Sequence, residues 1–279
     1  MQRAWLPDAV CQRSVCRAHL GTGAFAVVIE QPSPLGRLAV KTLASTKASL
    51  RLHLGELLAE GLRHPCIASV LAVFFDGTAL TVVMDHGGDQ TLVESSNSLT
   101  GSALLHAVAD TTFGVLFLHS RGLVHQDLKP DNVLWCSENL RARVADFGCM
   151  RLQGTWSECV GAFEWQAPEV QRRRARPHCV TFNLDAWSLG LLFEGLARAA
   201  RLPSWSPLPR ILRGAFCPLL VRDPTLRGCI ADCTRHLCQR SKEFRNGEPC
   251  RETPSRAAAL GGDFKAAPSG RLPFAVTEL

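Results

Sequence analysis

The chain has 279 residues, 46% hydrophobic and 20% charged, with a formal net charge of +6. This balance excludes an intrinsically disordered chain and allows one large domain or two smaller lobes. The charge is mild, and no run of about 18 apolar residues is uninterrupted, so we expect neither a nucleic-acid partner nor a membrane span. The basic run at residues 171–178 is either a solvated loop or a docking patch for an acidic partner. Twelve cysteines without a preceding signal sequence indicate reduced thiols and a cytoplasmic protein.

The first part of the chain alternates short apolar runs with turn signals, a pattern that predicts strands. The expected strands cover residues 24–30, 38–43, 67–75 and 80–85. Between them, residues 47–65 carry leucines at helical spacing and end at a proline. This segment predicts a single helix inserted in a small sheet.

After residue 84 the pattern becomes mainly helical. Residues 102–122 and 184–200 are predicted to be amphipathic or buried helices. Residues 201–228 contain five prolines among apolar residues and predict no definite element, and residues 261–279 predict a loose tail.

A glycine-containing stretch, LGTGAFAVV, leads into the first predicted strand. Glycines allow backbone N–H groups to approach phosphates where a side chain would collide. The third glycine of a G-x-G-x-x-G motif is Ala26 here, and a plain turn between strands explains two glycines about as well. The candidate nucleotide contacts in this stretch are Leu20, Gly21, Thr22, Gly23, Ala24, Phe25, Ala26, Val27 and Val28.

Lys41 lies near the end of a predicted strand, in LAVK, where an inward lysine needs an anionic partner. In phosphoryl-transfer enzymes with this arrangement, the partners are the α and β phosphates of ATP and a glutamate from a neighbouring helix. Glu56 is our candidate for that glutamate, and Glu60 on the same segment is the alternative.

The stretch VHQDLKPDN has the register of a phosphoryl-transfer catalytic loop. Asp127 would accept or orient the substrate hydroxyl proton, and Lys129 would stabilise the transferred phosphoryl group. Asn132 would hold a magnesium ion. Nineteen residues beyond Asp127, the stretch VADFGCM supplies Asp146 as a second magnesium ligand.

Two further motifs follow in order. The sequence APE at residues 167–169 closes a segment that is typical of an activation segment. The stretch LDAWSLG places Asp185 at a helix start, where its carboxylate can accept backbone N–H bonds and anchor the catalytic loop. Gln126 stands where an arginine that binds an activation-segment phosphate is usual. Because glutamine is neutral, we predict activity without phosphorylation of that segment.

On these motifs the chain resembles a eukaryotic-type protein kinase from Leu20 to about Leu260. The resemblance implies an α+β, bilobal kinase fold, ATP and Mg²⁺ as cofactors, and a protein substrate. The implied parts are an N-terminal extension at 1–15, a β-rich N-lobe with one helix at 16–84, a mainly helical C-lobe at 85–260 and a flexible tail at 261–279.

Four stretches resemble the Mos family, serine/threonine kinases of germ cells that act at the top of a MAP kinase cascade. They are the Gly-Gly hinge MDHGGDQTL, the stretch GVLFLHSRGLVH, the spacing from Glu56 to RHP, and the cysteine of DFGCM. In the hinge, Met84 and Asp85 would contact ATP. The resemblance implies a monomer that phosphorylates serine or threonine on a MAP kinase kinase during oocyte meiosis.

Two positions depart from the family pattern. Ala162 replaces a threonine that normally bridges the catalytic aspartate and lysine. The arginine that pairs with Glu169 of APE usually sits in an R-P-S motif, and the stretch CRETPSR makes Arg251 the expected partner, with Arg256 second. A pseudokinase that serves as a binding scaffold, a divergent viral kinase and a small-molecule phosphotransferase are the alternative hypotheses.

Overall fold

The computed structural model describes residues 19–22, 26–33, 36–44, 53–158, 161–173, 176–204 and 206–236. The chain divides into two units, residues 1–237 and 238–279. The second unit, with the predicted tail and with Arg251 and Arg256, lies outside the described residues.

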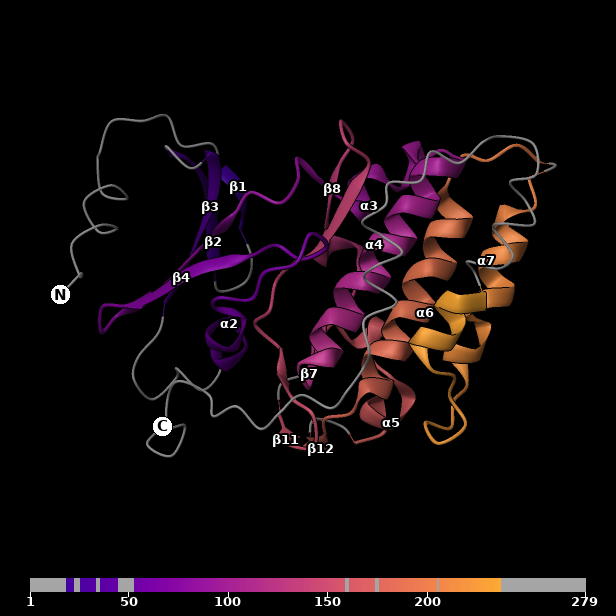
Figure 1. Cartoon of the computed structure of the whole chain (residues 1–279). Coiled ribbons are helices and arrows are strands. Elements are labelled where there is room, and N and C mark those ends of the chain that lie inside the picture. Colours follow the sequence, from indigo (N-terminus) through magenta and orange to yellow (C-terminus); the bar gives the residue numbers. More distant parts are fainter. Residues whose placement is uncertain are drawn as a thin grey trace. The chain divides into compact units, whose positions relative to one another are not determined.

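The first part of the described chain forms a five-stranded antiparallel sheet in the order β1-β2-β3-β5-β4 (Figure 1). Its strands are β1 His19–Thr22, β2 Ala26–Ser33, β3 Gly36–Ala44, β4 Val70–Phe75 and β5 Ala79–Asp85. The four predicted strands are present with shifted ends, and β1 adds a fifth. Lys41 lies opposite Val28 of β2 and Val82 of β5, in the middle of the sheet.

Helix α2, Leu54–Ala59, ends before the predicted segment of residues 47–65 does, and residues 47–52 of that segment lie outside the described residues. It ends at Glu60, which adopts an extended backbone conformation and forms a bridge with Val70 at the start of β4. Gly61 follows with a positive φ of 80°. Because the chain turns here, Leu62, the leucine of the predicted segment after Ala59, does not continue the helix.

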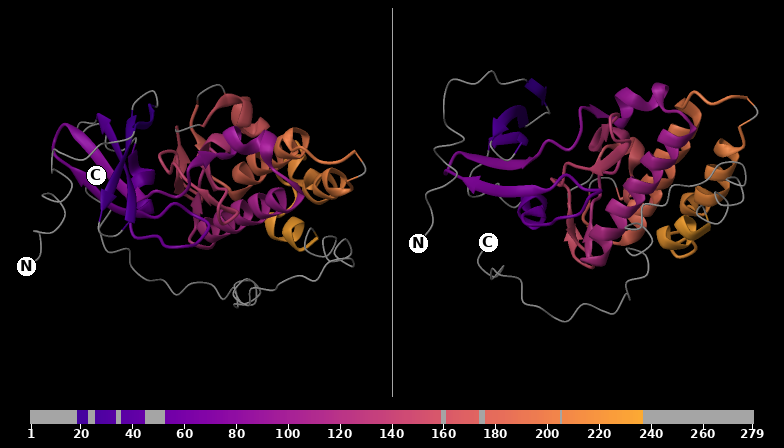
Figure 2. Two further views of the ribbon diagram at one scale, coloured as in Figure 1. Left: turned by 90° about the horizontal axis from the view of Figure 1, so that it is seen from above. Right: turned by 45° about the horizontal axis from the view of Figure 1, so that its top comes forward.

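The second part of the described chain is mainly helical. Its helices are α3 Leu92–Ser95, α4 Gly101–Ser120, α5 Pro168–Gln171, α6 Phe182–Ala199 and α7 Leu208–Phe216. Helix α6 packs against both α4 and α7 (Figure 1), and Figure 2 shows the same helices from two further directions. One cluster of buried apolar side chains joins these helices to the sheet, from Val82 through Leu104 and Leu189 to Leu212.

Short strands and 3₁₀ turns connect the helices and carry several of the motifs described above. They are β6 Gln90–Thr91, η2 Ser96–Ser98, β7 Leu123–Val124, η3 Pro130–Asn132, β8 Val133–Cys136, β9 Arg141–Val144, β10 Arg151–Leu152, β11 Trp156–Ser157, η4 Phe163–Trp165, β12 His178–Cys179 and η5 Cys217–Leu220. The strands pair as β6-β8-β9, β7-β10 and β11-β12. The architecture is α+β, as the sequence predicts.

Helix α4 is long and apolar enough to cross a membrane by length and composition, contrary to the expectation from the sequence. However, 56% of its apolar window is buried inside the fold, and the helix packs against β9 and α6. A helix that is apolar on most sides is also typical of the core of a soluble domain, and we interpret α4 in this way.

The proline-rich residues 201–228, for which the sequence predicts no definite element, contain α7 and η5. Three of the five prolines, Pro207, Pro209 and Pro218, lie where helices begin. Pro207 is the N-cap of α7, and Pro218 lies in the first turn of η5. Proline is tolerated there because the first N–H groups of a helix have no intrahelical partner, so these residues start helices where the sequence pattern suggested breaks.

Candidate active site

The catalytic loop begins directly after β7, and Asp185 in the first turn of α6 holds it in place. The carboxylate of Asp185 is fully buried and accepts the backbone N–H groups of His125 and Gln126, each at 2.8 Å. His119 Nε2 of α4 lies 2.8 Å from the same carboxylate. Burial alone would raise the pKa of Asp185, but these hydrogen bonds outweigh it and lower the pKa. The loop is therefore anchored on a buried, ionised carboxylate.

Asp127 is surrounded by donors. Its Oδ2 lies 3.0 Å from Lys129 Nζ and accepts Asn132 Nδ2 at 2.8 Å. Its Oδ1 accepts the backbone N–H of Ala162 at 2.9 Å. Burial disfavours the charged form of Lys129, but Asp127 outweighs this effect and raises the pKa of Lys129. The three predicted catalytic-loop residues thus meet at one carboxylate.

Lys41 joins the sheet to α2 and to the DFG segment. Its Nζ lies 2.7 Å from Glu56 Oε1 and 2.7 Å from Asp146 Oδ1. Burial disfavours the ammonium, but the two carboxylates outweigh it and raise the pKa of Lys41. Glu60, the alternative partner, instead accepts the backbone N–H of Val73 at the protein surface.

Glu56 is 1% exposed, and its position depends on the residue before it. A Cβ at Gly55 would collide with the carbonyl oxygen of Phe147 and would lie 2.8 Å from the N–H of Met150. Only glycine allows α2 to lie this close to the DFG segment. Burial raises the pKa of Glu56, and the charge of Lys41 opposes this rise.

Asp146 and Asn132 offer oxygen ligands of the kind that hard divalent cations prefer. Asp146 has a positive φ of 58° and a side chain that is 47% exposed, and its Oδ1 contacts Lys41. Asn132 directs Nδ2 to Asp127, so its amide oxygen points elsewhere. Among the described residues there is no group of three or more His, Cys, Asp or Glu that could hold a metal. The donor set fits a cation that shares its coordination with phosphate oxygens.

The pairing of Glu169 differs from the prediction. The carboxylate of Glu169 forms a bidentate ion pair with Arg227, with N–O distances of 2.8 and 2.9 Å. The prediction of Arg251 or Arg256 is therefore wrong. Arg227 stands in DPTLRG, where glycine follows the arginine, so this stretch does not match the R-P-S motif. Its side chain is fully buried, and Arg227 also donates to the carbonyls of Asn183 and Val221.

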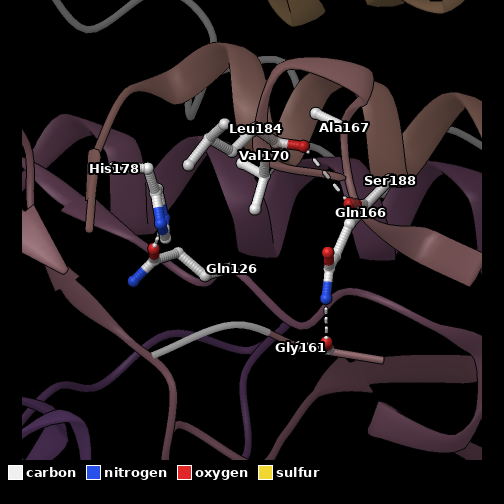
Figure 3. A pocket seen from close by; sticks show the side chains of 8 residues that line it. All are labelled: Gln126, Gly161, Gln166, Ala167, Val170, His178, Leu184 and Ser188. Carbon is white, nitrogen blue, oxygen red and sulfur yellow. Dashed lines mark hydrogen bonds between the residues drawn. The ribbon is translucent and has the colours of Figure 1, made fainter. Parts of the chain in front are cut away.

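Gln126 has a positive φ of 67° and forms two neutral hydrogen bonds with its side chain. Its Nε2 donates to the carbonyl of Cys149 at 2.7 Å, and its Oε1 lies 2.8 Å from His178 Nε2 (Figure 3). The first contact holds the residue after DFG, and the second holds β12. No sequence motif indicates His178 as a partner, because it lies 52 residues from Gln126.

Comparisons with known proteins agree with this geometry. A sequence profile described as the protein kinase domain matches residues 15–205. The chain belongs to the protein kinase family. Its α+β arrangement is accordingly the bilobal kinase fold, and membership implies the use of ATP and a divalent metal.

Several relatives are serine/threonine kinases by name. The chain is 29% identical over 259 residues to a probable myosin light chain kinase of Dictyostelium discoideum, covering 78% of this chain and 72% of that protein. It is 30% identical over 179 residues to the serine/threonine-protein kinase CLA4 of Saccharomyces cerevisiae, and 32% over 135 residues to shk1/pak1 of Schizosaccharomyces pombe. These matches cover 62% and 46% of this chain but only 20% of each fungal kinase. The family and these relatives together identify an ATP-dependent serine/threonine protein kinase.

The nucleotide side of the kinase is described in part. Leu20, Gly21 and Thr22 belong to β1, and β2 begins at Ala26, with Val27 and Val28 following, whereas Gly23, Ala24 and Phe25 lie outside the described residues. At the hinge, Met84 is buried at the end of β5. The carboxylate of Asp85 accepts the N–H of Ser69 at 2.9 Å and lies 3.5 Å from Arg143. The backbone N–H of Asp85 donates to the Ser69 carbonyl at 3.0 Å, so the backbone carbonyl of Asp85 is the group that could contact ATP.

Proposed function

We propose that this kinase is Mos-like and transfers the γ-phosphate of ATP to serine or threonine on a MAP kinase kinase. The hinge supports the proposal. A Cβ at Gly88 would lie 2.8 Å from the carbonyl of Trp135 on β8, and Gly87 has a positive φ of 71°, so the backbone of this hinge favours glycine at both positions. Thr91 then caps α3 in a reciprocal pair with Glu94. Both features belong to the MDHGGDQTL stretch that resembles the Mos hinge.

We assign the chemistry to the residues gathered around Asp127. The substrate hydroxyl attacks the γ-phosphorus, its proton passes to Asp127, and ADP leaves. Lys129 stabilises the charge of the transferred group, and Lys41, oriented by Glu56, binds the α and β phosphates. Asn132 and Asp146 would hold Mg²⁺, which neutralises phosphate charge when bound.

The second candidate function is a pseudokinase scaffold, favoured by the loss of threonine at position 162. The catalytic carboxylate is nevertheless held without that hydroxyl, because Lys129 contacts Asp127 directly at 3.0 Å and the N–H of Ala162 donates to it at 2.9 Å. Lys41 also keeps both carboxylate partners. These contacts favour the enzyme.

The experiment that tests the proposal is phosphate transfer from labelled ATP and Mg²⁺ to inactive MAP kinase kinase. Asp127→Asn and Lys41→Met are the controls, and both should abolish transfer. Transfer to a general kinase substrate with none to MAP kinase kinase would reject the Mos-like assignment. Nucleotide binding with no transfer to either substrate would instead support the scaffold.

A further inference from the structure

The peptide unit between Gly161 and Ala162 is hydrogen-bonded at both ends. Its carbonyl oxygen accepts Gln166 Nε2 at 2.6 Å, and its N–H donates to Asp127 Oδ1 at 2.9 Å. Figure 3 shows the side chain of Gln166 pointing to the Gly161 carbonyl. The Gln166 side chain is therefore connected to the Asp127 carboxylate by two hydrogen bonds, with one peptide group between them.

Asp127 Oδ1, the oxygen that accepts the Ala162 N–H, is also the carboxylate oxygen that remains open to substrate. Asp127 Oδ2 accepts from Lys129 and Asn132, which occupy its two lone pairs. Among the described residues Oδ1 accepts only the Ala162 N–H, so one lone pair is left for the substrate hydroxyl proton. The Ala162 N–H therefore fixes the oxygen that accepts the proton.

Two features hold this peptide unit in place. A Cβ at Gly161 would collide with Asp127 Oδ1 and lie 2.6 Å from the Gln126 carbonyl, so only glycine fits. Gln166 lines a cavity of about 10 Å³, together with Val170 and Leu184. This volume is at the lower limit for one water molecule, so solvent cannot easily replace the Gln166 amide.

We propose that Gln166 is a positioning residue for phosphoryl transfer and acts on Asp127 through the Gly161–Ala162 peptide unit. A hydrogen bond to a peptide carbonyl polarises the group and strengthens its N–H as a donor. The bond from Gln166 also fixes the plane of the peptide, and with it the direction of the Ala162 N–H. In this way a backbone group, supported by one glutamine, does the work of a hydroxyl side chain at position 162.

The test is a comparison of Gln166→Met with Gln171→Met. Both changes keep the side-chain volume and remove one glutamine bond to the same loop, since Gln171 Nε2 donates to the Phe163 carbonyl at 2.8 Å. With myelin basic protein as a general substrate, Gln166→Met should lower kcat about tenfold, as expected for one lost hydrogen bond. KM for ATP should not change, and Gln171→Met should keep the parent kcat. Equal losses in the two variants, or no loss in either, would overturn the proposal.

A second variant tests the hydrogen-bond donor that Gln166 supplies to the Gly161 carbonyl. In Gln166→Glu the ionised carboxylate cannot donate to the Gly161 carbonyl, whereas the protonated acid can. The kcat of this variant relative to the parent should therefore rise as the pH is lowered from about 8 to about 5.5, towards the range where glutamate gains a proton. A purely structural role predicts a constant ratio, which would also overturn the proposal. Because the pH dependence of this ratio is measured without Gln166→Met, it decides the question even if Gln166→Met folds poorly.

Discussion

The two sides of the catalytic loop are built with different chemistry. On the nucleotide side, Lys41 forms short ion pairs with Glu56 and Asp146. On the side of the activation segment, Gln126 forms neutral hydrogen bonds with the Cys149 carbonyl and His178. Charged contacts respond strongly to an added phosphate or a lost charge, whereas neutral bonds do not. The comparison teaches that this kinase uses charge around the nucleotide and neutral hydrogen bonds where Gln126 holds Cys149 and β12.

The largest effect is expected from the charged side. Lys41→Met should lower kcat at least about 100-fold, because it removes a cation that stabilises phosphate charge. Gln126→Met should lower kcat by no more than about tenfold, because it removes only neutral hydrogen bonds. The measurement is steady-state phosphate transfer to a general substrate at saturating ATP. Equal losses of kcat in the two variants would contradict the proposed difference between the nucleotide side and the activation-segment side.

A buried charge outside the reaction centre should matter for stability. Arg227→Met should lower the free energy of unfolding by about 3 kcal/mol, because Glu169 loses its bidentate partner. Arg198→Ala is the matched control, since the ion pair of Arg198 with Glu194 lies on the surface and is worth at most about 0.5 kcal/mol. Urea titration followed by fluorescence measures both. A stable Arg227→Met variant would show that Glu169 needs no partner.

Lowering the pH should destabilise the Gln126–His178 contact on the activation-segment side before it affects the ion pairs on the nucleotide side. Burial, with a further contribution from Arg173, lowers the pKa of His178 below its unfolded value of 6.5, and Glu169 opposes this shift. The unfolded chain therefore binds the proton first, and the stability contribution is full above about pH 6.5 and falls as the pH drops below it. The pKa values of Asp146 and Asp185 are also lowered, but for carboxylates the loss begins only near about pH 4.

His178→Gln isolates this effect, because glutamine can donate to Gln126 and does not titrate. Urea titrations of the parent and the variant at pH 7 and pH 5.5 should show a smaller loss of stability in the variant. Other histidines contribute equally to both proteins and cancel. An equal loss in the two proteins would contradict the assignment.

The smallest effect is expected at the activation segment itself. Thr155 is exposed and Ser157 is buried, and these are the hydroxyl side chains between Cys149 and Gln166. Thr155→Ala, or phosphatase treatment of the parent, should leave kcat unchanged, because Gln126 has no charge with which to bind a phosphate. A large loss of activity after either treatment would show that the segment is controlled by phosphorylation after all.

The sequence predicted best where the site is built from short motifs. Asp127, Lys129 and Asn132 lie within six residues, so their register alone predicts that they meet. Glu56, nine residues before Pro65, is the predicted partner of Lys41, and the structure confirms it over Glu60, which lies beyond the end of α2. The four strands were predicted because each is a short apolar run between turn signals.

The rest depended on contacts that a sequence does not display. Arg227 is 58 residues from Glu169, and a glycine in place of proline hid its motif. Ala162 lacks the hydroxyl of a threonine, but its backbone N–H donates to Asp127; since every residue except proline carries this group, the sequence does not reveal the contact. Prolines mark both breaks and helix starts, so α7 could not be distinguished from a loop.

The absence of a side chain at Gly55 has a consequence for inhibition. The backbone of α2 lies directly against the Phe147 carbonyl, so no flexible side chain can absorb a movement of either part. A compound that drives Phe147 outward must therefore push α2 with it, and this pulls Glu56 away from Lys41. In this kinase, displacement of the DFG phenylalanine and release of the Lys41–Glu56 pair should form a single transition, with no intermediate in which only one has occurred.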